Sequence, residues 1–339
     1  MDYSRAARHG RNDSPWVRTH PVVHFRVGLN KVNRRDFLRF ATAGTTVGLL
    51  TPSQLSLAAD QLPNPVGYAV ISWPDQDLPT ALQAISSLGF QGVQLLDWVT
   101  NTYQGVRTAE FARQLAELKL QPVLLSAHRI SLTDEHHEDE VARLHADAAF
   151  LQKLGGRCLQ ISDNGEPKRA YPRDVILSFG ERLNRLGKLA GDYGLQLGYH
   201  PHTGTIGQTR EGLGQIMEAT DPARVKLIAD VGHLLLGGSD PAEVIRTYHE
   251  RLVAMHFKDV RRDTLELARR EGKSYPSKFL FCEIGKGEVN FTGIVDAIRE
   301  VRYEGWIIIE LDAYEHRPGG PQTSAEMNRD AMRRLGFRI

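Results

Sequence analysis

From Val66 to its end, the chain alternates short apolar runs with longer amphipathic segments. Mostly apolar runs of this length suit strands that are buried on both faces, as in a parallel sheet. We expect eight such strands, at Val66–Ile71, Gly92–Leu96, Pro122–Ser126, Arg157–Ser162, Leu195–His200, Val225–Asp230, Leu252–His256 and Trp306–Leu311.

The segments between these runs place apolar residues at i, i+3 and i+4, which predicts amphipathic helices. Glycine follows several of them directly, where a helix commonly ends. A stretch without a clear element, Val260–Val289, is expected to cover the site as a lid. The predicted helices are Leu78–Leu88, Thr108–Leu118, Glu138–Leu154, Val175–Tyr193, Glu211–Ala219, Pro241–Glu250, Phe291–Val301 and Ser324–Leu335.

Eight strand–helix units predict a TIM (β/α)8 barrel, which typically needs about 250 residues. A doubly wound open sheet is the alternative, and it would carry a glycine-rich phosphate turn after an early strand. The first expected strand instead runs into Ser72-Trp73-Pro74. We therefore expect a barrel over residues 60–339.

Residues 1–59 differ from the rest and resemble an export leader. Arg34-Arg35 is followed by Phe37-Leu38, then by the apolar stretch Phe40–Leu50 and by small residues near Ala58. This order of basic, apolar and cleavable regions is typical of a signal peptide, and the paired arginines resemble a twin-arginine signal. We expect a disordered leader, the twin-arginine translocase as a partner, and a periplasmic or secreted mature protein.

Charge and cysteine content narrow the classes of function. The formal net charge is +1, which gives no electrostatic support for nucleic acid or an anionic membrane as a partner. Two cysteines, Cys158 and Cys282, cannot form a disulfide framework, and both lie in or near apolar runs. We interpret them as core thiols. Assembly into a homo-oligomer is left open.

Polar residues stand at the ends of four successive apolar runs. His200, Asp230, His256 and Glu310 occupy these positions. Because the carboxyl ends of barrel strands converge on one face, we expect these four side chains to meet. Imidazole and carboxylate together suit a divalent metal ion, with Mn²⁺, Co²⁺ and Zn²⁺ as candidates.

Further candidates lie next to these residues. His202 and Lys258 each follow a polar strand end by two positions, so they face the same side in extended backbone. Asp259 is able to pair with Lys258. His233 begins what we expect to be a loop. For Asp230 the alternative role is to cap the following helix.

The second half of the chain resembles the xylose isomerase-like family of TIM barrels, and within it the inosose (keto-inositol) dehydratases. The likeness rests on segments that appear in the same order: Tyr199–Thr205, Asp230-Val231-Gly232-His233, His256–Arg262, Gly285-Lys286-Gly287 and Gly305–Glu310. It covers Leu195–Asp312 well and Val66–Gln160 by architecture only.

The resemblance implies a divalent metal on His200, Asp230, His256 and Glu310. Many relatives have glutamate where His200 stands. Strand four ends in Ser162-Asp163-Asn164 where a close dehydratase relative would be more acidic, and dehydratases of this type are cytoplasmic. These departures leave the substrate and the metal open.

We therefore expect a metal-dependent enzyme that removes a proton beside the carbonyl of a keto-sugar or keto-cyclitol. Glu310 and His202 are candidate bases, and Lys258 and His233 could protonate a departing hydroxyl. Dehydration by a lyase is favoured, and isomerisation or epimerisation starts from the same enediolate. A metal-dependent endonuclease and a non-catalytic sugar-binding protein are the other classes. Expected substrate-binding residues are Trp73, Asp97, His128 and Arg261.

Overall fold

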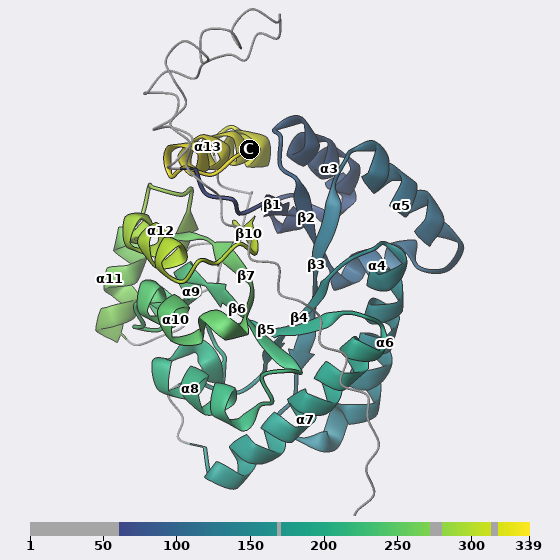
Figure 1. The fold of residues 1–339 in the computed structure, drawn as a ribbon, viewed down its shortest axis with the longest axis vertical. Helices are drawn as coiled ribbons and strands as arrows, with labels where there is room; N and C mark the ends of the chain where they lie inside the picture. Colours follow the sequence, from purple (N-terminus) through teal and green to yellow (C-terminus); the bar gives the residue numbers. More distant parts are fainter. Residues whose placement is uncertain (1–60, 168–170, 272–279, 313–317) are drawn as a thin grey trace, which may run out of the picture. The chain divides into compact units, whose positions relative to one another are not determined.

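The computed structural model describes residues 61–339 except 168–170, 272–279 and 313–317. Within this part, parallel strands close into a barrel with helices around it, which confirms the TIM barrel (Figure 1). The predicted leader at 1–59 lies outside the described residues. The barrel strands, in the order in which they pair, are β1 (Val66–Ala69), β2 (Gly92–Leu96), β3 (Gln121–Ile130), β4 (Cys158–Asp163), β5 (Gln196–Tyr199), β6 (Val225–Asp230), β7 (Leu252–Phe257) and β10 (Trp306–Ile309), which pairs back with β1.

All the helices predicted from the sequence are present, with ends shifted by a few residues. The α-helices are α3 (Leu78–Ser87), α4 (Asp97–Tyr103), α5 (Thr108–Glu117), α6 (His137–Lys153), α7 (Arg173–Asp192), α8 (Arg210–Ala219), α9 (Val231–Leu236), α10 (Pro241–Tyr248), α11 (Arg262–Glu271), α12 (Phe291–Glu300) and α13 (Gly320–Arg334). Of these, α4, α9 and α11 were not predicted.

The sequence predicted no clear element in the stretch Val260–Val289. That prediction is wrong, because the stretch holds secondary structure. It contains α11, and β8 (Asp259–Val260) pairs antiparallel with β9 (Phe281–Cys282). The α11 sequence is highly charged, so its helical period was masked by the scarcity of apolar residues.

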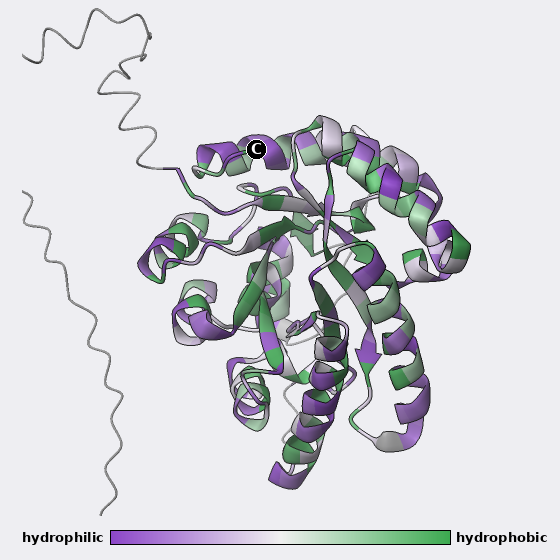
Figure 2. Cartoon of the chain, turned by 45° about the vertical axis from the view of Figure 1, so that its right-hand side comes forward, coloured by the Kyte–Doolittle hydropathy of each residue, from purple (hydrophilic) through white to green (hydrophobic). Residues whose placement is uncertain are grey.

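The core forms because each helix buries one apolar stripe against strands that are apolar on both faces. In α12, Phe291, Ile294, Val295 and Ile298 follow the i, i+3, i+4, i+7 spacing and are all buried. Burying each such side chain contributes about 1.5–3 kcal/mol. Figure 2 shows the result as apolar strands inside a ring of mixed helices.

Helix ends follow the local chemistry of the sequence. Gly89, Gly155 and Gly194 adopt positive φ angles of 89°, 74° and 72°, each two positions after the last residue of α3, α6 and α7. A left-handed residue at this point satisfies the last helical carbonyls, and glycine adopts it without a Cβ clash. Asp240 caps α10 by accepting a hydrogen bond from the backbone N–H of Ala242.

Two further features complete the described fold. Cys158 is buried in β4, as expected for a core thiol, and burial raises the pKa of its thiol. Among the described residues, no helix is both long and apolar enough to span a membrane.

Candidate metal centre

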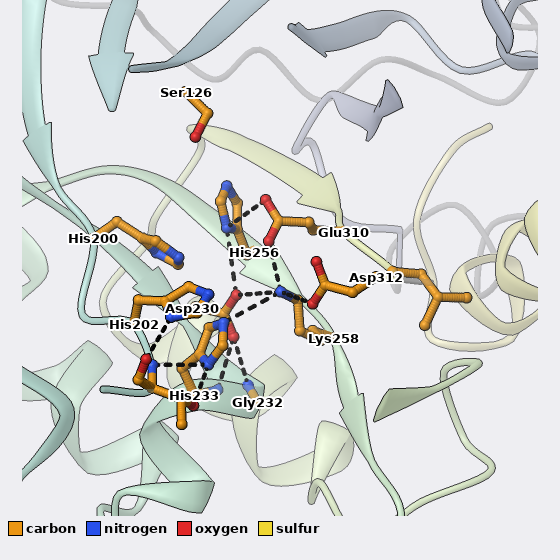
Figure 3. A network of polar contacts seen from close by, with 12 residues as sticks. Ser126, His200, His202, Asp230, Gly232, His233, His256, Lys258, Glu310 and Asp312 are labelled. Carbon is orange, nitrogen blue, oxygen red and sulfur yellow. Dashed lines mark hydrogen bonds and ion pairs between the residues drawn. The ribbon is translucent and has the colours of Figure 1, made fainter. Parts of the chain in front are cut away.

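The carboxyl ends of β5, β6, β7 and β10 bring together the side chains expected there. His200 directly follows β5, Asp230 ends β6, His256 lies near the end of β7, and Glu310 directly follows β10. At least 96% of each residue's surface is buried, with exposed fractions of 1%, 0%, 0% and 4%. The cluster is drawn in Figure 3.

The distances within this cluster are those of groups that could share one ion. His256 Nδ1 lies 3.4 Å from Asp230 Oδ2 and 3.3 Å from Glu310 Oε2. The His200 and His256 rings are 4.9 Å apart between centroids. Metal bonds of 2.0–2.2 Å in tetrahedral geometry separate neighbouring ligand atoms by about 3–3.5 Å. The expected juxtaposition is therefore present.

Either His233 or His256 could be the second histidine of the ligand set. Single ligand atoms of His200, Asp230, His233 and Glu310 lie within 4.8 Å of one another. The backbone N–H of Thr203 donates to His233 Nδ1 at 3.2 Å, and His233 Nε2 lies 3.3 Å from Lys258 Nζ. Nδ1 of His233 thus has a hydrogen-bond donor of its own, whereas neither nitrogen of His256 has a hydrogen bond. Hydrogen bonding therefore favours His256 as the ligand.

The two carboxylate oxygens of Asp230 have different partners. Oδ1 accepts hydrogen bonds of 2.9 Å from the backbone N–H groups of Gly232 and His233, which caps α9. Oδ2 faces the cluster and has no hydrogen-bond partner. The capping role weighed from the sequence is thus present, and the role as a metal ligand stays a prediction. His233 was expected to begin a loop, but the capping makes it part of α9, where it is fully buried.

The unpartnered atoms of the cluster fit a divalent cation. Both ring nitrogens of His200 and of His256, and Asp230 Oδ2, are buried without hydrogen bonds. An unsatisfied buried polar group typically costs about 1–3 kcal/mol, so a missing partner is expected at this point. Asp230, Glu310 and Asp312 with Lys258 leave two net negative charges, which one divalent ion would neutralise.

Lys258 lies inside the cluster and not at the rim with Asp259. Its Nζ donates to Glu310 Oε1 at 2.6 Å and to Asp312 Oδ2 at 3.0 Å, and lies 3.6 Å from Asp230 Oδ2. Burial alone would lower the pKa of Lys258, but the carboxylates of Asp312, Glu310 and Asp230 outweigh it and raise that pKa. The ammonium therefore stays charged.

Asp259 does not pair with Lys258, which the sequence had left possible, because the Asp259 carboxylate has other partners. It accepts hydrogen bonds from the backbone N–H group of the next residue, Val260, and from three backbone N–H groups of the loop after β9. These three belong to Gly285, Gly287 and Val289, and all four distances are 2.8–3.0 Å. Asp259 is therefore an anchor for this loop.

Two residues of the site were missed in the sequence. Asp312 is 5% exposed and accepts from Lys258. Gln94, fully buried in β2, donates from Nε2 to Glu310 Oε2 at 2.7 Å. Asp312 stands two positions after Glu310, the same spacing that singled out His202 and Lys258. A single amide inside an apolar strand gives no comparable signal.

The remaining imidazoles form the side of the cluster near the loop after β5. The His202 and His233 rings are 3.9 Å apart between centroids, and Thr203 Oγ1 lies 2.6 Å from His233 Nδ1. Burial lowers the pKa of His200, His202 and His233. These rings are therefore neutral near pH 7 and able to accept a proton or bind a cation.

Burial alone would raise the pKa of Glu310, but His256 and Lys258 hold it well below its usual range. Its Oε1 and Oε2 also accept from Lys258 and Gln94. Glu310 is consequently a weak base whose two oxygens are already occupied by donors. On this ground His202 is the better suited of the two base candidates.

The four expected substrate-binding residues are more scattered. Trp73 packs against Tyr68 with ring centroids 5.6 Å apart, and Asp97 is exposed at the start of α4. His128 is half-buried in β3, while Arg261 is exposed and pairs with Asp263 at 2.6 Å. Among described residues, no hydrogen bond or ion pair joins them to the cluster. Their binding role stays a prediction.

Known proteins are similar to this chain in sequence and in fold. A family model described as xylose isomerase-like TIM barrel matches residues 82–335. The chain belongs to this family. Inosose dehydratase of Bacillus velezensis is 32% identical over 269 residues, which cover 73% of this chain and 88% of the relative. Inosose dehydratase of Geobacillus kaustophilus is 29% identical over 297 residues, or 80% and 94% of the two chains.

Solved structures share the fold. The IolI protein with a bound zinc atom has a TM-score of 0.64 at 14% identity, covering 80% of this chain and 98% of that one. A probable 3-DHS dehydratase of Bacillus anthracis has a TM-score of 0.64 at 16% identity, with coverage of 81% and 100%. The dehydratase relatives support an enzyme of the xylose isomerase-like family.

Proposed function

We propose that this protein is a metal-dependent lyase that dehydrates a keto-cyclitol or keto-sugar through an enediolate, as an inosose dehydratase-like enzyme. The observation that carries the proposal is the set of buried, unpartnered donor atoms on His200, Asp230 and His256 beside a charged Lys258. The dehydratase relatives support the reaction class. Mn²⁺, Co²⁺ and Zn²⁺ are the ions that this donor set suits.

His200, Asp230, His256 and Glu310 would hold the ion. When bound, it would act as a Lewis acid toward a substrate carbonyl. A nearby neutral imidazole is then placed to take a proton from the carbon beside that carbonyl, and His202 fits because its lowered pKa leaves the ring unprotonated near pH 7. Lys258, charged and held by Glu310 and Asp312, is placed to donate a proton to a departing hydroxyl.

His233 could also donate a proton to a departing hydroxyl, as Lys258 could. The backbone N–H of Thr203 can only donate, so His233 Nδ1 accepts and the proton of the neutral ring sits on Nε2. Lys258 Nζ lies 3.3 Å from that nitrogen, and because both atoms carry protons they are neighbouring donors and not a hydrogen-bonded pair. Lys258 and His233 are therefore the two groups that could protonate a departing hydroxyl.

Solvent-deuterium exchange tests the proposal. Metal-loaded protein is incubated in deuterated buffer with 2-keto-myo-inositol, and carbon-bound deuterium and loss of water are followed by NMR. We expect exchange and an unsaturated ketone product. Chelated protein is the control, with metal added back. Exchange with a rearranged ketone as product would favour the isomerase or epimerase alternative, and absence of exchange across a panel of polyhydroxy ketones would favour a binding protein.

A further inference from the structure

Arg129 brings a second positive charge next to the cluster, from β3. Its Nη2 lies 3.1 Å from His202 Nδ1 and donates to the carbonyl of Thr203 at 3.4 Å, while Nη1 donates to the carbonyl of Gly204 at 3.3 Å. The residue is exposed. Its guanidinium is therefore accessible to solvent while it touches the histidine that we propose as the base.

An irregularity in β3 directs Arg129 to this place. Ser126 pairs with Gln160 and Arg129 pairs with Ser162, so β3 advances by three residues where β4 advances by two. Gln160 donates to Ser126 Oγ on one face of these strands. Regular alternation would put residues 126 and 129 on opposite faces, but the extra residue lets Arg129 share a face with its partner. Bulges of this kind often re-aim a side chain beside an active site.

The charge of Arg129 is not needed by the cluster. The carboxylates of the cluster already have a cationic partner, because Lys258 Nζ lies 2.6–3.6 Å from Asp230, Glu310 and Asp312. Among described residues, no carboxylate pairs with Arg129, whose contacts are two carbonyl oxygens and an imidazole nitrogen. A guanidinium stays protonated at any physiological pH. The Arg129 guanidinium thus remains as a solvent-exposed positive charge beside the site.

We propose that Arg129 is a specificity-determining residue that binds an anionic group, a carboxylate or a phosphate ester, on the polyhydroxy ketone. The inference rests on the proposed function and narrows its substrate to a charged one. Arginine donates charge-assisted hydrogen bonds to either anion. Because Arg129 contacts the His202 ring, an anionic group bound to the guanidinium would lie within one imidazole ring of the His202 atom that accepts the proton.

The test measures binding to metal-loaded protein with three ligands that share one carbon skeleton. D-Fructose, D-fructose 6-phosphate and D-fructuronate differ at carbon six, which is a hydroxymethyl, a phosphate ester or a carboxylate. Titration calorimetry gives Kd for wild type, Arg129→Met and Arg129→Lys. Arg113→Met, on an exposed position of α5, is the control for loss of a surface arginine.

We expect one or both anionic ligands to bind wild type at least about tenfold tighter than D-fructose, because a charged hydrogen bond contributes about 1.5–3 kcal/mol and 1.4 kcal/mol is tenfold in Kd. Arg129→Met should lose this preference and keep its affinity for D-fructose, and Arg129→Lys should keep part of it. The stronger anion identifies the group.

Absence of any preference in wild type, or a preference that survives Arg129→Met, would overturn the assignment. A second outcome would also overturn the assignment: no anion preference in wild type, together with slower deuterium exchange of neutral ketones in Arg129→Met. Arg129 would then act on the enediolate and not on an anionic group. Failure of the proposed function appears separately, as absence of exchange in the wild-type protein.

Discussion

Removing the Lys258 ammonium should destabilise the metal-free protein strongly. In Lys258→Met, the carboxylates of Asp230, Glu310 and Asp312 would remain buried without the cation that now lies 2.6–3.6 Å from each. Removing one partner of a buried pair typically costs about 3–5 kcal/mol. At about 2–4 °C per kcal/mol for a domain of this size, the melting temperature should fall by about 6–20 °C.

The pH dependence of this loss follows from the two carboxyl groups whose pKa is lowered. Burial alone would raise the pKa of Asp230 and Glu310, but Lys258 and the neighbouring imidazoles outweigh it. The resulting stability is present above their ordinary pKa of about 4 and is lost as the pH falls through the lowered values. The gap between wild type and Lys258→Met should therefore be widest near neutral pH and narrow below about pH 4.

Differential scanning calorimetry of chelated protein provides the measurement. Lys188→Met is the matched control, because Lys188 is 64% exposed and pairs with Asp192 in solvent, where such a pair contributes about 0–1 kcal/mol. Added divalent metal should recover more of the stability of Lys258→Met than of wild type, since it supplies the missing charge. A chelated Lys258→Met protein that melts within about 2 °C of wild type would refute the reasoning.

Three other predictions concern separate parts of the chain. Elemental analysis should find about one divalent metal per chain, with less in Asp230→Asn and Glu310→Gln, and equal metal in both variants would count against these ligands. Burial first, and then nearby Asp97, raises the pKa of Asp147 to about 6. Its ionisation thus opposes folding as the pH rises from about 4 to 6, so Asp147→Asn should gain about 1–3 kcal/mol in denaturant unfolding at pH 8 and little at pH 4; an equal gain at both values would contradict this. Intact-mass measurement of periplasmic material should show loss of residues 1 to about 59, and unchanged export after Arg34-Arg35→Lys-Lys would contradict the twin-arginine reading.

The barrel could be predicted because its strands are apolar runs of the right length and its larger helices keep a clear period. The elements that were missed are short or highly charged. Helix α9 has six residues, and it begins where Asp230 Oδ1 caps it, a contact that depends on the position of β6. Helix α11 has so few apolar residues that its period is hard to see.

The sequence reveals those site residues that stand at the ends of strands. His200, Asp230, His256 and Glu310 were found in this way, and Asp312 could have been found by its spacing from Glu310. Gln94 could not, because only the curvature of the barrel brings β2 to Glu310 after β10. Arg129 depends on an extra residue in β3, whose effect on side-chain direction cannot be read from hydrophobic alternation.

The hydrogen bonds of Asp259 restrict how the reactive end of β7 can move. Three backbone N–H groups of the loop after β9 donate to Asp259, the residue directly after Lys258, so the chain at this point is fixed to that loop. Any movement of the ammonium between Glu310, Asp312 and a bound molecule has to come from torsions along the lysine side chain itself. Such rotations are local, so proton delivery from this position would not wait for a segment of the protein to close.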